Sequence, residues 1–288
     1  MKRNTFTFAE KNGLSLEAEL IIGDRPHSQT VIYFHGGGLL YGKKDDLDPA
    51  YIQQFLDADY NLLLVDYRLA PETKLPEIYE DVEDAILWFY QVAENTLGLP
   101  NRHFALFGRS SGAFLSLLAA ADPTLPKPFA VLSFYGYYSA SAPFLLEENA
   151  YFNTFPQISD TLKDAMIHKT PLVFGPVDSR YPLYVYARQK GAFQELVFGK
   201  KVDHATKAPF DLIPERDFHF LPPLFLAHSL SDQDVPVTES MTLEKGTLGS
   251  ELHCVNGLPH DFDTQTVEAE GKLAYEKAIS FLNKKRLD

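Results

Sequence analysis

The sequence Phe104–Phe114, FALFGRSSGAF, contains the clearest indication of the fold. Its first four residues form an apolar run that is typical of a buried strand, and Ser111–Ala121 predicts a helix. Between the two lies Gly108-Arg109-Ser110-Ser111-Gly112, which fits the G-x-S-x-G pattern of a tight strand-to-helix turn. Such a turn needs glycines because side chains at those positions would collide, and it lifts the Ser110 hydroxyl above the sheet at a helix N-terminus. We therefore predict that Ser110 is a nucleophile; the alternative is a serine with a purely structural role in the turn.

Short apolar runs on either side of this turn predict a parallel sheet. Runs that are nearly all apolar are typical of strands covered on both faces. They lie at Thr30–Phe34, Tyr60–Val65, Phe104–Phe107, Ala130–Phe134, Leu224–Ala227 and Leu252–Val255. From Leu14 to Leu20, apolar and polar residues alternate instead, which predicts an antiparallel edge strand with one face in water.

Segments with helical periodicity separate these strand runs. Apolar residues follow the spacing of one helix face over Ile78–Phe89 and again over Val267–Phe281. Asp48 followed by Pro49 is a good helix start and predicts a further helix over Pro49–Leu56. Alternating strands and helices indicate an α/β fold with a mostly parallel, doubly wound sheet and an antiparallel N-terminal edge.

One long segment, from Tyr138 to Leu221, breaks this alternation. It contains no buried strand run, but short helices are expected at Ser159–Ile167 and Ser179–Lys190. Because a structureless loop of that length is improbable, we expect a partly helical lid at 138–221, inserted into a single domain that spans residues 1–288. Its aromatic residues either line an acyl pocket or form the lid's own core; they include Tyr151, Phe152, Phe155, Tyr184 and Tyr186.

A glycine triplet directly follows the first buried strand run. His35-Gly36-Gly37-Gly38 leaves backbone amides unshielded, and such amides can hold an oxyanion as a carbonyl becomes tetrahedral. The alternative interpretation is a flexible hairpin tip. His35 is expected to form local hydrogen bonds that shape the loop, and we assign it no proton transfer.

A serine nucleophile needs a base, and the base needs an anion that fixes its tautomer. Asp232 follows the strand run Leu224–Ala227, and His260 follows the run Leu252–Val255, so both lie at the edge of the sheet where catalytic groups collect. Asp234 is the rival carboxylate. The order Ser110, Asp232, His260 is the Ser-Asp-His order of α/β-hydrolases. A neutral His260 would give activity that rises with pH through an apparent pKa of about 6.5.

The chain resembles the α/β-hydrolase superfamily, and within it the esterases similar to hormone-sensitive lipase. The resemblance rests on His35–Gly38, on Asp66-Tyr67-Arg68-Leu69-Ala70-Pro71-Glu72 and on Gly108–Gly112, while Asp232–Pro236 looks more like small carboxylesterases. It implies an α/β-hydrolase fold and a triad of Ser110, Asp232 and His260. It also implies an oxyanion hole made by the amides of Gly37, Gly38 and Ser111, and a segment from Asp66 to Glu72 that braces the loops around them. Too few residues precede the first strand for an N-terminal cap, so the lid is expected from 138–221.

The expected activity is that of a serine carboxylesterase acting on small or short-chain acyl esters, with no metal or organic cofactor. Tyr41, Arg109 and Tyr184 are candidate substrate-binding residues. Arg109 either favours an anionic substrate or has a surface role. One alternative is a small-amide hydrolase or peptidase, formamide hydrolysis included, with the same triad; another is a ligand-binding protein that has lost catalysis.

Composition excludes other classes of partner. The net charge of −13 disfavours a nucleic acid or an anionic membrane as partner. Because the sequence contains neither a signal peptide nor a membrane-spanning apolar run, the protein is expected in the cytoplasm. The single cysteine, Cys254, cannot form an intramolecular disulfide and is expected to be a small core residue. The sequence does not predict an oligomeric state.

Overall fold

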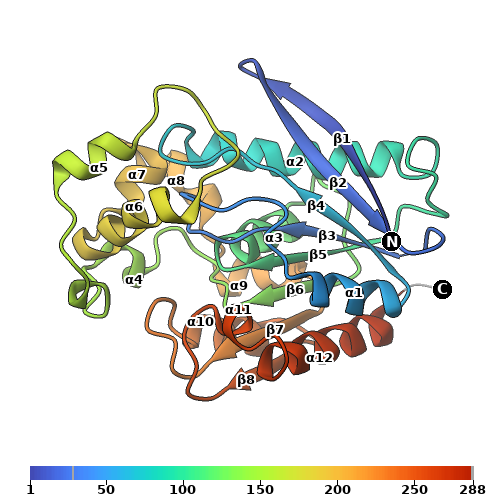
Figure 1. Cartoon of the computed structure of the whole chain (residues 1–288). Coiled ribbons are helices and arrows are strands. Elements are labelled where there is room, and N and C mark those ends of the chain that lie inside the picture. The colour runs from blue at the N-terminus through green and yellow to red at the C-terminus, as the bar shows by residue number, and fades with distance from the viewer. Residues whose placement is uncertain (28, 287–288) are drawn as a thin grey trace.

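A mixed sheet forms the centre of the computed structural model, which describes residues 1–27 and 29–286 (Figure 1). The strands are β1 (Lys2–Lys11), β2 (Leu14–Ile22), β3 (Gln29–Phe34), β4 (Tyr60–Val65), β5 (Phe104–Arg109), β6 (Val131–Phe134), β7 (Leu224–Ser229) and β8 (Glu251–Val255). Within the described ranges they form one eight-stranded sheet in the order β1-β2-β4-β3-β5-β6-β7-β8. The pairs β1–β2 and β2–β4 are antiparallel, and all other neighbours are parallel. The predicted α/β fold with an antiparallel N-terminal edge is confirmed.

Helices pack on both faces of this sheet. The helices of the described residues are α1 (Pro49–Asp57), α2 (Leu75–Val92), α3 (Ser111–Ala121), α4 (Pro143–Leu146), α5 (Asp160–Met166), α6 (Val177–Lys190), α7 (Phe193–Phe198), α8 (His204–Lys207), α9 (Pro214–Asp217), α10 (Thr238–Gly246), α11 (Phe262–Gln265) and α12 (Glu270–Lys285). Short 3₁₀ helices lie at η1 (Phe152–Thr154), η2 (Ala208–Phe210) and η3 (Phe218–Phe220).

The central strands are buried on both faces, as their apolar runs predict. In β3, Val31 and Tyr33 point to the face covered by α1 and α12, whereas Ile32 and Phe34 point to the face covered by α2 and α3. This alternation follows from the period of two along a strand, and it explains why strands covered by helices on both faces are mostly apolar at successive positions. The helix predicted after Asp48 also forms, and the Asp48 carboxylate accepts a hydrogen bond from the Ala50 amide at 2.8 Å.

Two predictions at the edges of the sheet are wrong. The edge strand is β1 rather than the stretch from Leu14, which lies in β2 between β1 and β4. At the opposite edge, β8 is only partly covered, so Cys254 is half-buried and is not a core residue. Both predictions failed for the same reason. A short apolar run indicates a strand but does not indicate whether that strand lies at the edge of the sheet, where it has a neighbour on one side only.

The 138–221 segment contains the short helices expected there, α5 and α6 among them, and connects β6 to β7. Arg180 of α6 fastens it to the rest of the protein. Its guanidinium is buried and donates to both carboxylate oxygens of Glu72, at 2.7 and 2.9 Å, and to the carbonyl of Ala70 at 2.6 Å. Removing one partner of such a buried pair leaves an unpaired charge, so this contact fixes α6 against the loop after β4.

Candidate active site

A strained turn presents Ser110 at the end of β5. Ser110 has φ +51° and ψ −118°, a conformation that non-glycine residues rarely adopt, and α3 begins at the next residue. The flanking glycines permit this turn. A Cβ on Gly108 would lie 2.1 Å from the Gly112 backbone, and one on Gly112 would lie 2.1 Å from the Phe34 carbonyl oxygen. The sequence therefore builds the elbow by omitting side chains where β5 and α3 meet.

Ser110, His260 and Asp232 form one hydrogen-bonded chain. Nε2 of His260 lies 2.9 Å from Oγ of Ser110, and Nδ1 of His260 lies 2.6 Å from Oδ2 of Asp232. The three side chains come from the loops after β5, β8 and β7, all at the carboxyl edge of the parallel strands. Because a carboxylate only accepts, the neutral imidazole carries its proton on Nδ1, and its Nε2 can accept a proton from Ser110.

The charges around His260 favour the protonated form of its imidazole. Burial lowers the pKa of His260, but the Asp232 carboxylate, with Asp234 and Asp261 nearby, raises that pKa overall to about 9. Burial raises the pKa of Asp232, yet His260 and His228 hold it below its usual range. The rise of activity with pH is therefore expected at a higher pH than the value near 6.5 that the sequence predicts.

Asp232 is held from three further directions. Its Oδ1 accepts from the amides of Asp234 and Val235 at 2.8 and 2.9 Å, and its Oδ2 lies 3.0 Å from Nε2 of His228. His228 is a contact that sequence reasoning missed. The sequence feature that could have indicated this contact is the position of His228 at the end of the β7 run, four residues before Asp232. Its ring is fully buried.

The rival carboxylate, Asp234, has different partners. Its Oδ1 accepts from Nε of Arg188 at 2.8 Å, and its Oδ2 accepts from the Tyr184 hydroxyl at 2.7 Å. Both partners lie on α6, within the 138–221 segment. Among the described residues, Asp234 makes no hydrogen bond to His260, so the carboxylate that reaches the imidazole is that of Asp232.

The glycine loop after β3 lies against the Ser110 turn. Gly37 and Gly38 have φ +108° and +58°; a Cβ on Gly37 would lie 1.9 Å from the Tyr41 carbonyl oxygen, and one on Gly38 would lie 2.3 Å from the Tyr184 ring. Within residues 1–27 and 29–286, no hydrogen bond uses either glycine amide. Ser111 ties this loop to α3 because its hydroxyl accepts from the Leu39 amide at 3.2 Å.

His35 shapes the same loop. Its ring is buried and stacks on Tyr67 with 4.2 Å between centroids, and its Nδ1 lies 2.7 Å from the Gly36 carbonyl oxygen. The Tyr67 hydroxyl donates to the His35 carbonyl at 2.8 Å. Burial lowers the pKa of His35. The segment from Asp66 to Glu72 thus contacts both the glycine loop, through Tyr67, and α6, through Glu72.

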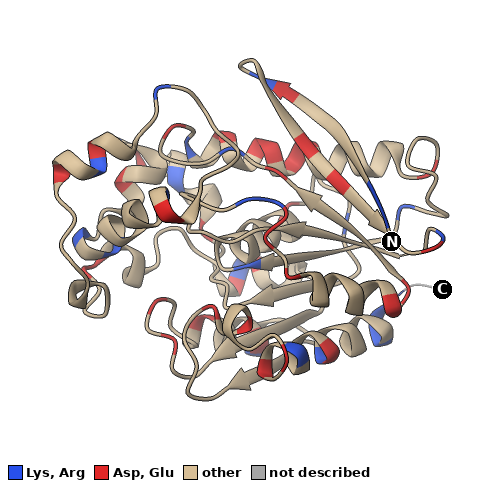
Figure 2. Ribbon diagram, in the orientation of Figure 1, with Lys and Arg blue, Asp and Glu red and all other residues tan. Residues whose placement is uncertain are grey.

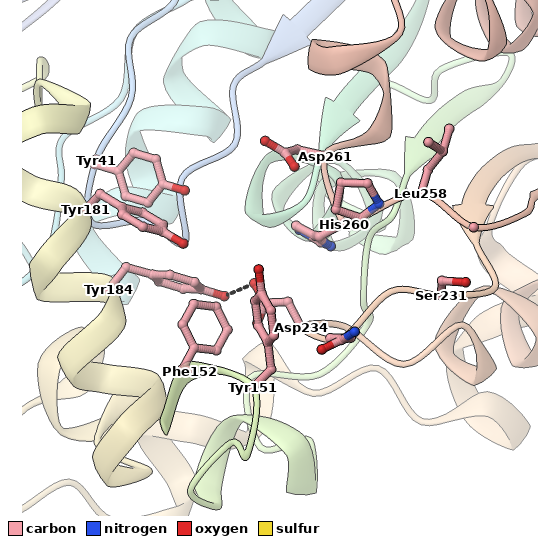
Figure 3. A pocket seen from close by; sticks show the side chains of 13 residues that line it. Tyr41, Tyr151, Phe152, Tyr181, Tyr184, Ser231, Asp234, Leu258, His260 and Asp261 are labelled. Atoms are coloured by element: carbon pink, nitrogen blue, oxygen red, sulfur yellow. Dashed lines mark hydrogen bonds between the residues drawn. The ribbon is translucent and has the colours of Figure 1, made fainter. Parts of the chain in front are cut away.

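Two cavities adjoin these groups. The larger, about 580 Å³, is lined by Ser110, the three loop glycines and Arg109, among others, and the smaller, about 250 Å³, lies beside His260 (Figure 3). Tyr41 and Tyr184 line both cavities. Tyr151 and Phe152 line the smaller one.

The remaining aromatic residues of the 138–221 segment contribute to its internal packing. Phe155 packs against Tyr151 and Phe152 with ring centroids 5.0 and 5.6 Å away. The Tyr186 hydroxyl donates to Asp160 at 2.7 Å, and Tyr186 lines neither cavity. The segment's aromatic residues therefore divide between cavity wall and small core.

Arg109 is buried, so the expected surface role is wrong. Its guanidinium pairs with Asp46 at 2.7 Å and with the fully buried Asp263 at 3.2 Å, and its Nε donates to the Tyr33 hydroxyl at 2.8 Å. Asp263 also accepts from the Tyr135 hydroxyl at 2.6 Å. The Tyr135 ring packs against the His260 ring with 4.7 Å between centroids. The buried network of Arg109 and Asp263 therefore contacts the imidazole through Tyr135.

In the part of the chain that the structure describes, no group of three or more His, Cys, Asp or Glu residues could hold a metal ion. None of the helices described there has both the length and the apolar character needed to cross a membrane.

The sheet order and the Ser110 elbow define an α/β-hydrolase. The BD-FAE family model matches residues 22–246, and the chain belongs to this family. A protein of unknown function from Staphylococcus aureus subsp. aureus Mu50 has a similar structure, with 31% identity, a TM-score of 0.85, and coverage of 98% of this chain and 99% of that one. An α/β-hydrolase superfamily protein from Enterococcus faecalis is 27% identical, with a TM-score of 0.81 and coverage of 98% and 99%.

Relatives of the chain include esterases. The carboxylic ester hydrolase LipN of Mycobacterium tuberculosis is 39% identical over 87 residues, which are 30% of this chain and 23% of LipN. The chain spans less than a third of the length of the curated relatives it matches. The predicted resemblance to α/β-hydrolase esterases is confirmed.

Proposed function

We propose that this protein is a serine carboxylesterase that hydrolyses small or short-chain acyl esters through an acyl-enzyme. The observation that carries this proposal is the hydrogen-bonded chain from Ser110 through His260 to Asp232, with distances of 2.9 and 2.6 Å. Membership of the BD-FAE family and the similarity to LipN support ester hydrolysis.

In the proposed reaction, His260 takes the proton from Ser110 as Oγ attacks the ester carbonyl carbon. The carbonyl π electrons move to its oxygen, which the amides of Gly37, Gly38 and Ser111 stabilise. The tetrahedral intermediate then collapses, and the alcohol leaves with the proton from His260. Water, deprotonated by His260, attacks the acyl-enzyme and releases the acid and free Ser110. Each oxyanion donor is worth about 10²–10³ in rate.

We also propose that the 138–221 segment is a lid within one hydrolase domain, and that it limits acyl size. Its α6 supplies Tyr184, which lies against Gly38 and forms part of the wall of both cavities. A larger acyl group would have to displace a tyrosine that is bound to Asp234.

The test is hydrolysis of p-nitrophenyl esters of increasing acyl length by the wild type and by Ser110→Ala. We expect activity on short acyl groups, a decline with length, and loss of at least about 10³-fold in the variant. Activity of a folded wild type on small amides but not on any ester would favour the amide-hydrolase alternative. Inactivity toward both would contradict the proposal and favour a ligand-binding role.

A further inference from the structure

Aromatic side chains form much of the wall of the smaller cavity. Five aromatic residues line it, four of them tyrosines: Tyr41, Tyr151, Phe152, Tyr181 and Tyr184. In Figure 3, the hydroxyls of Tyr41 and Tyr181 point across the cavity toward the side that carries His260 and Asp261, whereas the Tyr184 hydroxyl is bound to Asp234. Ring faces attract cations, and phenol oxygens accept hydrogen bonds from ammonium groups. This wall is therefore suited to a small, positively charged group.

The charged side chains of the cavity lining include carboxylates, which attract a positively charged group. The lining contains the carboxylates of Asp234 and Asp261 and no lysine or arginine. Asp234 is neutralised by Arg188, with 2.8 Å between Nε and Oδ1. Asp261 is exposed, and among the described residues it makes no ion pair; its carboxylate accepts only from the Thr264 hydroxyl, at 3.1 Å. When His260 is neutral, as a catalytic base must be, Asp261 thus leaves one uncompensated negative charge in the cavity lining.

The rest of the surface adds to this attraction. The net charge is −13, and Figure 2 shows acidic residues along α2 and β2. No residue of these two elements lines the smaller cavity. A field of this sign raises the local concentration of cations and lowers that of anions. An anionic substrate, one of the expectations for Arg109, is disfavoured further because Asp46 and Asp263 already pair with that arginine.

The position of the cavity assigns it to one part of the substrate. His260 lines both cavities, whereas Ser110 and the loop glycines line only the larger one, so the smaller cavity lies on the histidine side of the nucleophile. In serine hydrolysis the imidazole passes its proton to the leaving oxygen, so the alcohol part of an ester lies on the histidine side. At about 250 Å³, the space fits a small group rather than a drug-sized one.

We propose that the smaller cavity binds a positively charged ammonium group on the alcohol part of the ester, so that the preferred substrates are esters of amino alcohols. This inference rests on the proposed esterase function. Asp261 supplies the charge, and Tyr41, Tyr181 and Tyr184 form the aromatic wall beside the cation. Asp261 and the tyrosines bind the leaving group and take no part in proton transfer.

A matched pair of substrates isolates the charge. Acetylcholine carries a trimethylammonium group where 3,3-dimethylbutyl acetate carries a neutral tert-butyl group of nearly the same shape. We expect kcat/KM for acetylcholine to exceed that for the neutral ester by at least about tenfold at low salt. The excess should shrink at high salt because Asp261 is exposed and its charge is screened.

Variants then locate the effect. Asp261→Asn should lower the ratio of the two kcat/KM values about fivefold, and Tyr181→Leu should lower it by a similar factor. The ratio is the proper readout because Asp261 also influences the pKa of His260, which affects both substrates equally. Glu94→Gln is the matched control: Glu94 is an exposed carboxylate that lines neither cavity, and its removal should leave the ratio unchanged.

The outcomes separate this inference from the proposed function. If the wild type hydrolyses the neutral ester and the ratio is one or lower, the cation site is refuted while the esterase proposal stands. A ratio above ten that Asp261→Asn and Tyr181→Leu leave unchanged also refutes this site. If the wild type hydrolyses none of acetylcholine, 3,3-dimethylbutyl acetate and p-nitrophenyl acetate, the esterase proposal itself fails.

Discussion

Replacing Asp232 by asparagine should remove most of the turnover while leaving the fold intact. Asparagine has the same shape, and its oxygen can still accept from the amides of Asp234 and Val235. Its nitrogen, however, would face His260 and His228, where the aspartate oxygen now lies 2.6 and 3.0 Å from ring nitrogens. An amide NH₂ donates, so Nδ1 of His260 must become the acceptor. The proton then sits on Nε2, which faces Ser110 and can no longer act as base.

The expected loss in kcat is about 10⁴-fold, the cost of the wrong tautomer in a serine triad. That factor corresponds to about 5.4 kcal/mol of transition-state stabilisation. KM for p-nitrophenyl acetate should change little because Asp232 lies behind the imidazole and lines neither cavity.

The assay is steady-state hydrolysis of p-nitrophenyl acetate, with circular dichroism to verify folding. Asp234→Asn is the control, because it changes the neighbouring carboxylate that binds Arg188 instead of His260. It should reduce kcat less than about tenfold at a temperature where the variant is folded. A loss below tenfold in a folded Asp232→Asn, or a larger loss in Asp234→Asn, would refute the assignment of Asp232.

Three further predictions follow from the same contacts. The pKa of His260 is raised, so its base form appears only at higher pH, and kcat/KM should rise through an apparent pKa above 6.5; a midpoint at or below 6.5 in a pH profile would contradict this. Gly38→Ala should lower kcat about 100-fold, because its Cβ would lie 2.3 Å from the Tyr184 ring and the loop would have to move its amides away from the oxyanion; a folded variant whose kcat stays within about threefold of the wild type would count against an oxyanion role. Arg109→Met should cost about 3–5 kcal/mol in urea unfolding because Asp263 would remain buried without its cation, and a cost below about 1 kcal/mol would show that Asp263 does not need it.

The sequence predicts the central fold and the Ser110 turn well because both depend on local patterns. Buried parallel strands read as apolar runs, and the turn needs glycine at positions where any Cβ would collide. The β1 strand escapes prediction because most of its side chains are exposed, as expected of an edge. β1 is held by its pairing with β2, by the packing of Phe6 and Phe8 against Trp88 of α2 at 6.0 and 6.3 Å, and by ion pairs such as that between Lys11 and Asp84 at 2.6 Å.

Long-range pairing explains what the sequence could not predict at the site. The sequence favours Asp232 over Asp234 but does not indicate what Asp234 binds, because its partner Arg188 is 46 residues away. In the same way, nothing beside Arg109 in sequence indicates that Asp263, 154 residues later, will meet it in the core. Such pairs form only when the 138–221 segment and the last helices have folded onto the sheet.

Labelling with a fluorophosphonate tests the central claim most directly. The reagent phosphonylates an activated serine, whose oxygen displaces fluoride from phosphorus, and mass spectrometry identifies the modified peptide. We predict one adduct per chain, on Ser110, and labelling that is much slower in His260→Ala, because the imidazole activates the hydroxyl. A folded wild-type protein that is not labelled, or is labelled on another residue, would contradict the account.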